Sequence, residues 1–578
     1  MIEPKYYSLN TLFADRVFRI PKYQRYYSWG QKQRQDLFSD ITHIFELNKK
    51  CVDRDHFMAT IVCYKTNEVK AVGSKEYRMY DIVDGQQRLT TLIILLKAIQ
   101  LKLAAGEEKD ELNKIIVKSD GNIILLQTNN TNKHIFNNYI RNGEMPKKCD
   151  LKTHADRNLY AGIKESQQFV ENWYDKNTEI LSLFRVIRNK LGFVVYDTDD
   201  PRVVYSVFEV LNSRGLVVDW LDKCKSSLMG LSFEKAKSDD SRNTFINELN
   251  DLWGNIYSEI AQYPIPGHEI IRVTATLYNG TESGKPQKAE TALSSLKDAC
   301  SSPEDTIKIS NQILEVAKKL VELRASVYLS PVTDVLQARV LAVAIYLTDS
   351  LSENERIKVL NQWEKVTFRI YGIFGKDSRY KVGDYVRLAN NIMNKASEAS
   401  RYSEIMAAIR KIGEGYPIEQ AIDEGLKDKD VYDCNQENIR YILWRYEEHL
   451  AREAGKGAIV NEEFKKTIWE TRTANETIEH IMPQNPEPGG AWEGKVIDKL
   501  NYSHVVNGIG NLILLPQTLN NEAKRQGFLA KKSVYLKSEG LRMVQEVTQQ
   551  NNWSEKEIKE REKKILDWVT NEWRDIAD

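Results

Sequence analysis

The most restrictive feature of this sequence is a pair of short segments near its C-terminal end. The first, at residues 475–485, reads NETIEHIMPQN, and the second, at residues 508–521, reads GIGNLILLPQTLNN. An acidic residue and a His end a strand-like run just before Pro483, and an Asn precedes an apolar strand and an Asn-rich turn. This order predicts two short strands followed by a helix, with polar side chains gathered where the three elements meet.

These polar residues match what hydrolysis of a phosphodiester requires. A water molecule must lose a proton near neutral pH, and His480 is the candidate base for that step. A Mg²⁺-like ion held by hard oxygen ligands would stabilise the developing charge, and Glu479 and Asn520 are the candidate ligands. Glu479 points to the opposite side of the strand from His480, so it reaches a metal only if the strand bends or ends there. Asn511 is expected to tie the loop and orient the His.

The bulk composition restricts the class of protein. The chain has 578 residues, beyond the roughly 250–300 at which one hydrophobic core stops growing, so we expect about two to four domains. The net charge is zero, so any nucleic-acid surface must be a local patch. Six scattered Cys without a CxxC pair are typical of a reducing, cytoplasmic compartment. Neither a signal peptide nor an apolar run of membrane-spanning length is present, so we expect no membrane partner.

Local patterns predict the elements along the chain. Apolar runs rich in β-branched and aromatic residues predict strands at residues 17–20, 57–64, 79–83 and 193–196. Helices are expected to begin near Ser28 and Gly85. The region 230–470 is read as almost entirely helical, with amphipathic segments at 307–328 and 336–348. Residues 485–490, rich in Pro and Gly, predict a loop, and Ser554 with Glu557 predicts a capping box before the last helix.

Three polar motifs interrupt the first 225 residues: IPKYQRYYSW at 20–29, DIVDGQQRLT at 81–90 and FEVLNSRG at 208–215. In the second motif a strand runs into Asp84–Gly85 and a helix begins. Gly permits the tight turn, and the N–H groups at a helix N-terminus attract anions. No Walker A motif is present, so the chain is not a P-loop NTPase.

The arginines of these motifs suggest a phosphate ligand. Arg88 places a cation in the first helical turn, where it opposes the helix dipole, and binding a phosphate would explain that position. Arg25 and Arg214 would add further planar, bidentate donors. The structural alternative is that these arginines form ion pairs with carboxylates of the same motifs, namely Asp81, Asp84 or Glu209.

The C-terminal segments, EHIMPQ followed by GNLILL and a later Asn, resemble the His-Asn-His nuclease domain of GmrSD-type modification-dependent restriction enzymes. The resemblance implies His480 as general base, Asn511 as the central Asn of the motif, and Glu479 with Asn520 near the metal. Asn521 is an adjacent alternative to Asn520. An Asn stands here where a full His-Asn-His pattern has its last His.

Two further features accompany this motif. His504 lies before the second strand, and we interpret it as structural. A basic run follows the site, and it is expected either to contact DNA phosphates or to form a solvated helix face; it consists of Lys524, Arg525, Lys531 and Lys532.

The N-terminal motifs, DGQQR with an upstream PxYQR and a downstream FExxNxRG, resemble the ParB/sulfiredoxin-like domain of the GmrS half of these enzymes. That domain binds and hydrolyses NTPs. The resemblance implies a nucleotide-binding set made of Asp84, Gly85, Gln86, Gln87, Arg88, Gln24, Arg25, Glu209, Asn212 and Arg214. After the third motif Asp222 and Lys225 match the family, whereas Val218 and Lys223 depart from it.

The expected fold class is α+β and predominantly helical. We predict three domains: a ParB/sulfiredoxin-like α/β domain at 1–230, a helical connector at 231–425, and a ββα-metal (His-Asn-His) nuclease domain at 426–578.

The resemblances at both ends imply an NTP-dependent type IV restriction endonuclease that cleaves phage DNA carrying hydroxymethyl- or glucosyl-hydroxymethylcytosine. Expected cofactors are Mg²⁺ or Mn²⁺ and an NTP (GTP, ATP, UTP or CTP). Expected partners are double-stranded DNA and a second copy in a homodimer. The alternatives are a phosphorothioate-sensing DNA-nicking defence protein and a nuclease-dead, nucleotide-gated DNA-binding regulator.

Overall fold

The computed structural model describes most of the chain, namely residues 4–49, 56–72, 75–118, 123–128, 133–200, 203, 207, 219–236, 238–281, 283–326, 329, 335–454, 473–496, 502–538 and 540–577. Contacts divide it into two compact units. The first comprises Met1–Thr281 and Gln287–Ala325, and the second Glu282–Pro286 and Ser326–Asp578. The finer division into three domains, with boundaries after residues 230 and 425, stays a prediction.

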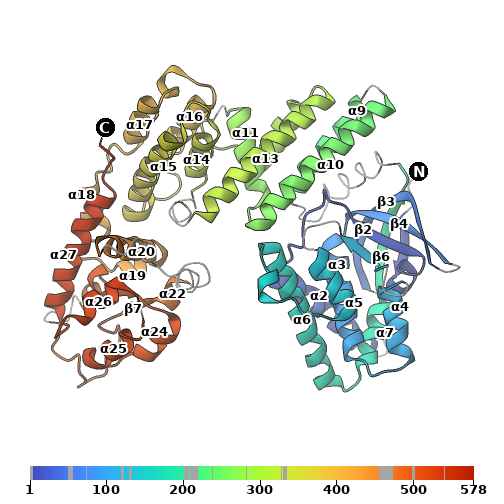
Figure 1. Cartoon of the computed structure of the whole chain (residues 1–578), viewed down its shortest axis with the longest axis horizontal. Helices are drawn as coiled ribbons and strands as arrows, with labels where there is room; N and C mark the ends of the chain where they lie inside the picture. Colours follow the sequence, from blue (N-terminus) through green and yellow to red (C-terminus); the bar gives the residue numbers. More distant parts are fainter. Residues whose placement is uncertain are drawn as a thin grey trace. The chain divides into compact units, whose positions relative to one another are not determined.

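A six-stranded mixed sheet forms the centre of the first unit (Figure 1). Its strand order is β1-β6-β3-β4-β2-β5; β1 and β4 run antiparallel to β6 and β3, and the other neighbours are parallel. The strands are β1 (Lys5–Ser8), β2 (Arg16–Ile20), β3 (His56–Val72), β4 (Lys75–Asp84), β5 (Leu126–Thr128) and β6 (Leu191–Thr198). The four predicted strands are confirmed as parts of β2, β3, β4 and β6, whereas the sequence patterns did not indicate β1 or β5.

One face of this sheet carries the larger core. Side chains alternate across a strand, so Phe18 and Tyr80 join a core with the helices, whereas Val17 and Met79 form a small cluster of their own. Helices α2, α3, α6 and α7 pack on the first of these faces (Figure 1). The β4–α3 turn therefore joins the sheet directly to this helical layer.

The helices of the first unit follow the sheet and extend beyond it. Helices α9, α10 and α13 pack side by side (Figure 1). The helices are α1 (Leu9–Leu12), α2 (Gln31–Lys49), α3 (Gln86–Lys102), α4 (Glu107–Ile116), α5 (Lys133–Asn142), η1 (Lys148–Asp150), α6 (His154–Asn177), α7 (Ile180–Lys190), α9 (Trp220–Lys235), α10 (Asp239–Gln262), α11 (Gly267–Tyr278), α12 (Ala289–Asp298) and α13 (Pro303–Ala325). The helix expected near Ser28 begins slightly later, at Gln31.

The second unit begins with helices that confirm the predicted helical region as far as the chain is described. They are α14 (Leu336–Leu347), α15 (Glu353–Thr367), η3 (Phe368–Ile373), α16 (Val382–Met393), η4 (Ser397–Ala399), α17 (Tyr402–Ile412), α18 (Ile418–Gly425), α19 (Val431–Cys434) and α20 (Gln436–Glu453).

A small hairpin surrounded by helices ends the second unit. Its elements are α22 (Ala474–Thr477), β7 (Ile478–His480), α23 (Tyr502–Val506), η7 (Ile509–Asn511), β8 (Leu512–Leu514), α24 (Gln517–Ala523), α25 (Phe528–Tyr535), α26 (Arg542–Thr548) and α27 (Glu555–Glu572). The capping box between Ser554 and Glu557 at the start of α27 is confirmed, and residues 485–490 form the expected loop.

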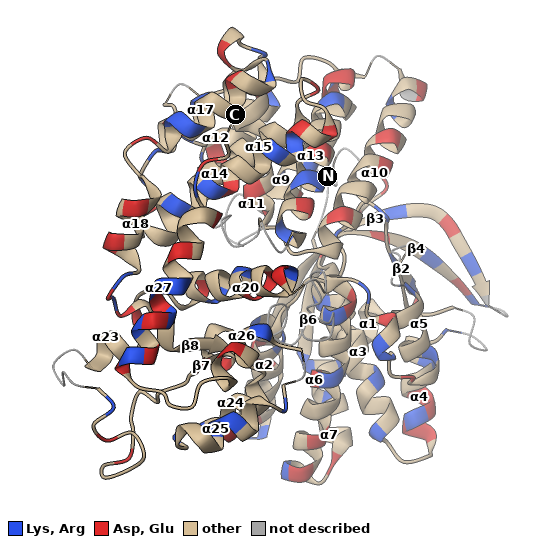
Figure 2. Ribbon diagram, turned by 60° about the vertical axis from the view of Figure 1, so that its left-hand side comes forward, with Lys and Arg blue, Asp and Glu red and all other residues tan. Residues whose placement is uncertain are grey.

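Charged residues of both signs are interspersed over the helices. On α27, Lys and Arg positions alternate with Asp and Glu positions (Figure 2). Among the described residues, no helix combines the length and the apolar character that crossing a membrane would require.

Candidate functional site

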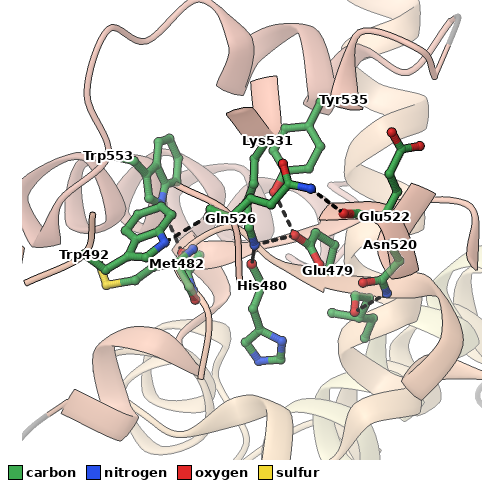
Figure 3. Close-up of polar contacts among 12 residues, drawn as sticks. Glu479, His480, Met482, Trp492, Asn520, Glu522, Gln526, Lys531, Tyr535 and Trp553 are labelled. Atoms are coloured by element: carbon green, nitrogen blue, oxygen red, sulfur yellow. Dashed lines mark hydrogen bonds and ion pairs between the residues drawn. The ribbon is translucent and has the colours of Figure 1, made fainter. Parts of the chain in front are cut away.

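The β7–β8 hairpin positions the predicted base. The two strands pair antiparallel, with Glu479 opposite Ile513 and His480 opposite Leu512. Because successive side chains of a strand point to opposite faces, Glu479 and His480 leave β7 on opposite sides, as Figure 3 shows. Helix α24 follows β8 after Pro516, which gives the strand–strand–helix order that the sequence predicts.

Asn511 fastens the chain immediately after His480. Its buried side chain accepts hydrogen bonds from the Met482 N–H (2.8 Å) and the Trp553 indole (3.0 Å). Its amide nitrogen donates to the carbonyl oxygens of Met482 and Val506, both at 2.8 Å. All four hydrogen-bonding positions of the amide are therefore used to hold the loop in place.

His480 is a neutral imidazole in a fixed orientation. Its Nε2 lies 3.0 Å from Oδ1 of Asn507, and the ring of Tyr432 packs edge-to-face against it with the centroids 4.4 Å apart. Burial lowers the pKa of His480 to about 4, although the hydrogen bond with Asn507 opposes this shift. At neutral pH the ring therefore has a free lone pair, which a proton acceptor needs.

Glu479 lies in a buried ion pair on the other side of β7. Its Oε1 accepts hydrogen bonds from Nζ of Lys531 (2.7 Å) and from the hydroxyl of Tyr535 (2.9 Å) (Figure 3). Lys531 also donates to the main-chain oxygen of His480 at 2.8 Å. Burial raises the pKa of Glu479 and lowers that of Lys531, and the ion pair opposes both shifts.

The expected metal ligands do not fit a cation in this arrangement. A metal ion at Glu479 would have to displace the Lys531 ammonium, which already neutralises the carboxylate. Asn520 donates its amide hydrogens to the carbonyl oxygens of Ile478 (3.1 Å) and Glu476 (3.4 Å). The adjacent alternative, Asn521, is exposed. Within the described parts of the chain, no group of three His, Cys, Asp or Glu side chains is placed to hold a metal.

The four residues of the basic run after the hairpin differ in how far they are exposed to solvent. Lys524 and Arg525 are exposed, and Lys532 is half-buried with its ammonium on the carbonyl of Gln550 (2.8 Å). The expectation that Lys531 contacts DNA is wrong for this arrangement, because its side chain is 0 % exposed and bound to Glu479. His504, which we interpreted as structural, lies exposed on α23.

In the first unit, two of the predicted nucleotide-binding residues serve as internal supports. Gln24 donates to the Val83 carbonyl (3.1 Å) and accepts from Lys225 (3.2 Å). Gln87 accepts from the Ser28 N–H (2.9 Å) and donates to the Tyr26 carbonyl (3.0 Å). Both amides are buried, so they fix the first motif against the β4–α3 turn.

The turn between β4 and α3 depends on a glycine. Gly85 has φ = 95°, which L side chains rarely adopt, and an added Cβ would lie 3.2 Å from the side chain of Ile61. Asp84 accepts a hydrogen bond from the Gly85 N–H (2.8 Å), and burial raises the pKa of this carboxyl. Gln86, which follows, is buried, and its side-chain oxygen has no hydrogen-bond partner among the described residues.

Arg25 belongs to a cluster of ionisable groups. Its Nε lies 3.2 Å from Oδ2 of Asp222, whose other oxygen accepts from the hydroxyl of Tyr257. Burial raises the pKa of nearby Asp219 and lowers that of Lys225 to about 8. Arg25 therefore forms an ion pair, as the structural alternative proposed, but its partner is Asp222 and not one of the carboxylates named there.

A cavity of about 160 Å³ opens beside this cluster. Its lining includes Arg25, Tyr27, His154, Asp219 and Tyr257. Aromatic faces and charged groups thus meet in one recess of the first unit.

The charge of Arg88 acts on Asp84 and opposes the rise in the pKa of that carboxyl. Arg88 lies half-buried in the first turn of α3, and within the described residues no hydrogen bond or ion pair engages its guanidinium. The remaining predicted members, Glu209, Asn212 and Arg214, lie outside the described residues.

Comparison with protein-family models identifies both ends of the chain. Residues 9–229 match the GmrSD restriction endonuclease N-terminal domain, and residues 416–568 match the GmrSD restriction endonuclease C-terminal domain. The chain belongs to the GmrSD family of restriction endonucleases. Family membership makes it a type IV, modification-dependent restriction endonuclease. No curated protein matches the chain.

In this GmrSD chain, no local sequence pattern indicated several of the residues that support the two sites. Asn507 forms a hydrogen bond with His480 and donates another to Asp430. Trp553 donates to Asn511, and Tyr257 donates to Asp222. Each partner lies 27 or more residues from the motif it supports, so no local spacing indicated the pairing. All three C-terminal supports, Asn507, Asp430 and Trp553, lie inside the matched C-terminal region of the family.

Proposed function

We propose that this restriction endonuclease cleaves phage DNA carrying modified cytosines, such as hydroxymethyl- or glucosyl-hydroxymethylcytosine, in a reaction that depends on an NTP. His480 acts as the general base, and Asn511 holds the loop that follows it. The DNA is double-stranded, and exposed Lys524 and Arg525 offer charges for its phosphates.

The observation that carries the assignment of the base is the placement of His480 on β7 between Asn507 and Tyr432. A neutral imidazole can take a proton from water, whereas an imidazolium cannot. Burial keeps the His480 ring neutral, and Asn507 and Tyr432 hold its orientation. A pKa of about 4 belongs to a weak base, but an approaching phosphodiester anion favours the protonated form and moves the pKa back toward neutrality.

The cofactors belong to the same proposal. Mg²⁺ or Mn²⁺ is proposed from the resemblance of the motif, and we assign no step to the ion because Lys531 already neutralises Glu479. GTP, ATP, UTP or CTP is the proposed nucleotide, with Arg88 at the start of α3 as its phosphate contact. We also propose a homodimer and a cytoplasmic location.

A cleavage assay with the purified full-length protein tests the proposal. The substrates are matched DNAs with unmodified, hydroxymethylated and glucosylated cytosine, with Mg²⁺ or Mn²⁺ and with or without each NTP. His480→Ala is the test variant, and addition of EDTA tests the metal. His504→Ala is a matched control, since His504 is an exposed His on α23 in the same part of the chain.

Cutting restricted to modified DNA, lost in His480→Ala and retained in His504→Ala, is the expected result. Cutting of every substrate would overturn the modified-cytosine assignment but keep the nuclease. Cutting of modified DNA by His480→Ala at the normal rate would overturn the assignment of the base.

A further inference from the structure

A chain of hydrogen bonds lies behind His480. Oδ1 of Asn507 lies 3.0 Å from His480 Nε2 and accepts from Nε2 of Gln484 at 2.8 Å. The amide nitrogen of Asn507 donates to Oδ2 of Asp430 (3.0 Å) and of Asp433 (3.4 Å). Asn507 is only 4 % exposed, so water does not compete strongly for these bonds.

The main chain fixes the same arrangement. The Tyr432 N–H donates to the Asn507 carbonyl (3.3 Å), and Oδ1 of Asp430 caps the short helix α19 by accepting from the Asp433 N–H (3.2 Å). The ring of Tyr432 then packs edge-to-face against His480. One short segment, residues 430–433, therefore supplies the carboxylates behind Asn507 and the aromatic wall beside the imidazole.

The chemistry of these groups allows one assignment of the hydrogens. Ionised carboxylates only accept hydrogen bonds, so the Asn507 amide must turn its nitrogen toward Asp430 and Asp433. Its oxygen then faces His480, and because an amide oxygen also only accepts, the hydrogen must be on His480 Nε2. In a neutral imidazole the lone pair is consequently on Nδ1.

We infer that Asn507, backed by Asp430 and Asp433, is the positioning residue that holds His480 in its Nε2–H tautomer and makes Nδ1 the proton-accepting atom. The inference rests on the proposed role of His480 as general base. In the step, an O–H bond of water breaks and its proton moves to Nδ1 while the water oxygen bonds to phosphorus. The bond from phosphorus to the leaving deoxyribose oxygen breaks, that oxygen takes a proton from solvent, and the imidazolium returns its extra proton to solvent.

This role differs from that of the charge on the opposite side of β7. Lys531 and Glu479 face away from the imidazole and neutralise each other, whereas Asp430, Asp433 and Tyr432 face the Asn507 side. Removal of Asn507 would leave Nε2–H without its acceptor. The ring would then populate the other tautomer, with the lone pair of Nδ1 lost.

The test is a nitrogen NMR measurement on the full-length protein labelled with ¹⁵N in histidine, recorded near pH 7.5 without DNA. The chain has 8 His, and His480→Ala assigns the signals of His480 by their disappearance. We expect the Nε2–H tautomer in the unmodified protein and a mixture or the Nδ1–H tautomer in Asn507→Ala. An Nδ1–H tautomer in the unmodified protein overturns the inference, and this result needs no folded variant.

Cleavage kinetics give the second readout. Asn507→Ala is expected to lower kcat by about 10²-fold or more with little change in KM for DNA, since a misoriented base loses most of the gain from proton transfer. Asn507→Asp, which keeps an acceptor for Nε2–H, is expected to recover part of that loss. Gln484→Ala is the matched control, because Gln484 donates to the same Asn507 oxygen and, among the described residues, has no hydrogen bond to the imidazole.

The outcomes separate this inference from the proposed function. An unchanged tautomer and unchanged kcat in Asn507→Ala overturn the positioning role. Equal losses in Asn507→Ala and Gln484→Ala, without a tautomer change, also overturn it and assign Asn507 to packing alone. If His480→Ala cuts DNA normally while the tautomer still depends on Asn507, the proposed base is wrong and the hydrogen-bond assignment stands.

Discussion

Lys531 and Glu479, which are 52 residues apart in sequence, form a buried ion pair with Nζ 2.7 Å from Oε1. The same ammonium binds the carbonyl of His480, so α25 is attached directly to the strand that carries the proposed base. Lys531 belongs to a basic run in the sequence, but in the fold it is buried and neutralises Glu479.

Replacing Lys531 by Met should destabilise the second unit by about 3–5 kcal/mol, because it leaves the Glu479 carboxylate buried and unpaired. Urea unfolding of the full-length protein measures the change. Lys532→Met on the same helix is the control, since Lys532 is half-buried and bonds one carbonyl, and it should shift the free energy of unfolding by less than about 1 kcal/mol. Weaker DNA binding by Lys531→Met at unchanged stability would instead favour a surface role for this lysine.

Asn511→Ala should lower the free energy of unfolding by at least about 3 kcal/mol, because it leaves buried groups of Met482, Val506 and Trp553 without partners. Asn521→Ala is the matched control, since Asn521 is exposed, and a change within about 0.5 kcal/mol is expected. Equal free energies of unfolding of the two variants in urea would contradict the role of Asn511 in holding the loop that follows His480.

Arg88→Ala should abolish NTP hydrolysis and change the melting temperature little, because no hydrogen bond or ion pair among the described residues is lost with its guanidinium. Phosphate release by the purified protein, followed with each NTP, measures the effect. Arg185→Ala, an exposed position in the same unit, should hydrolyse NTP normally. Turnover that persists in Arg88→Ala would remove Arg88 from the nucleotide site.

The pH dependence of stability should show the titration of Glu447. Its carboxylate is 1 % exposed and accepts from the N–H groups of Arg542 (2.6 Å) and Met543 (2.7 Å), and burial raises its pKa to about 7. Because the folded pKa lies above the unfolded value of about 4.3, the folded state binds more protons between these values. The associated stability is present below pH ~4 and is lost as pH rises through 7, by about 4 kcal/mol.

Glu447→Gln removes this titration, so the stability advantage of the unmodified protein over the variant should shrink as pH rises from 5 to 8. Urea unfolding at a series of pH values measures it. Glu453→Gln, an exposed position on the same helix, should run parallel to the unmodified protein across the range. A constant difference between Glu447→Gln and the unmodified protein would show that Glu447 does not titrate between these pH values.

The sequence by itself determined the elements whose causes are local. Apolar runs rich in β-branched and aromatic residues predicted parts of β2, β3, β4 and β6, Gly85 marked the turn into α3, and Ser554 with Glu557 marked the start of α27. The short runs at Glu479 and after Asn511 likewise indicated the two strands β7 and β8, because strand alternation and turn residues act over a few positions.

Only the tertiary structure decided which groups those elements bring together. In the folded chain, Glu479 forms a buried ion pair with Lys531, and burial lowers the pKa of His480. Asn507 lies between the imidazole and the carboxylates of Asp430 and Asp433. No characteristic spacing in the sequence indicates any of these contacts. Desolvation and hydrogen-bond partners depend on chain segments that meet in space, and those conditions exist only once the fold has formed.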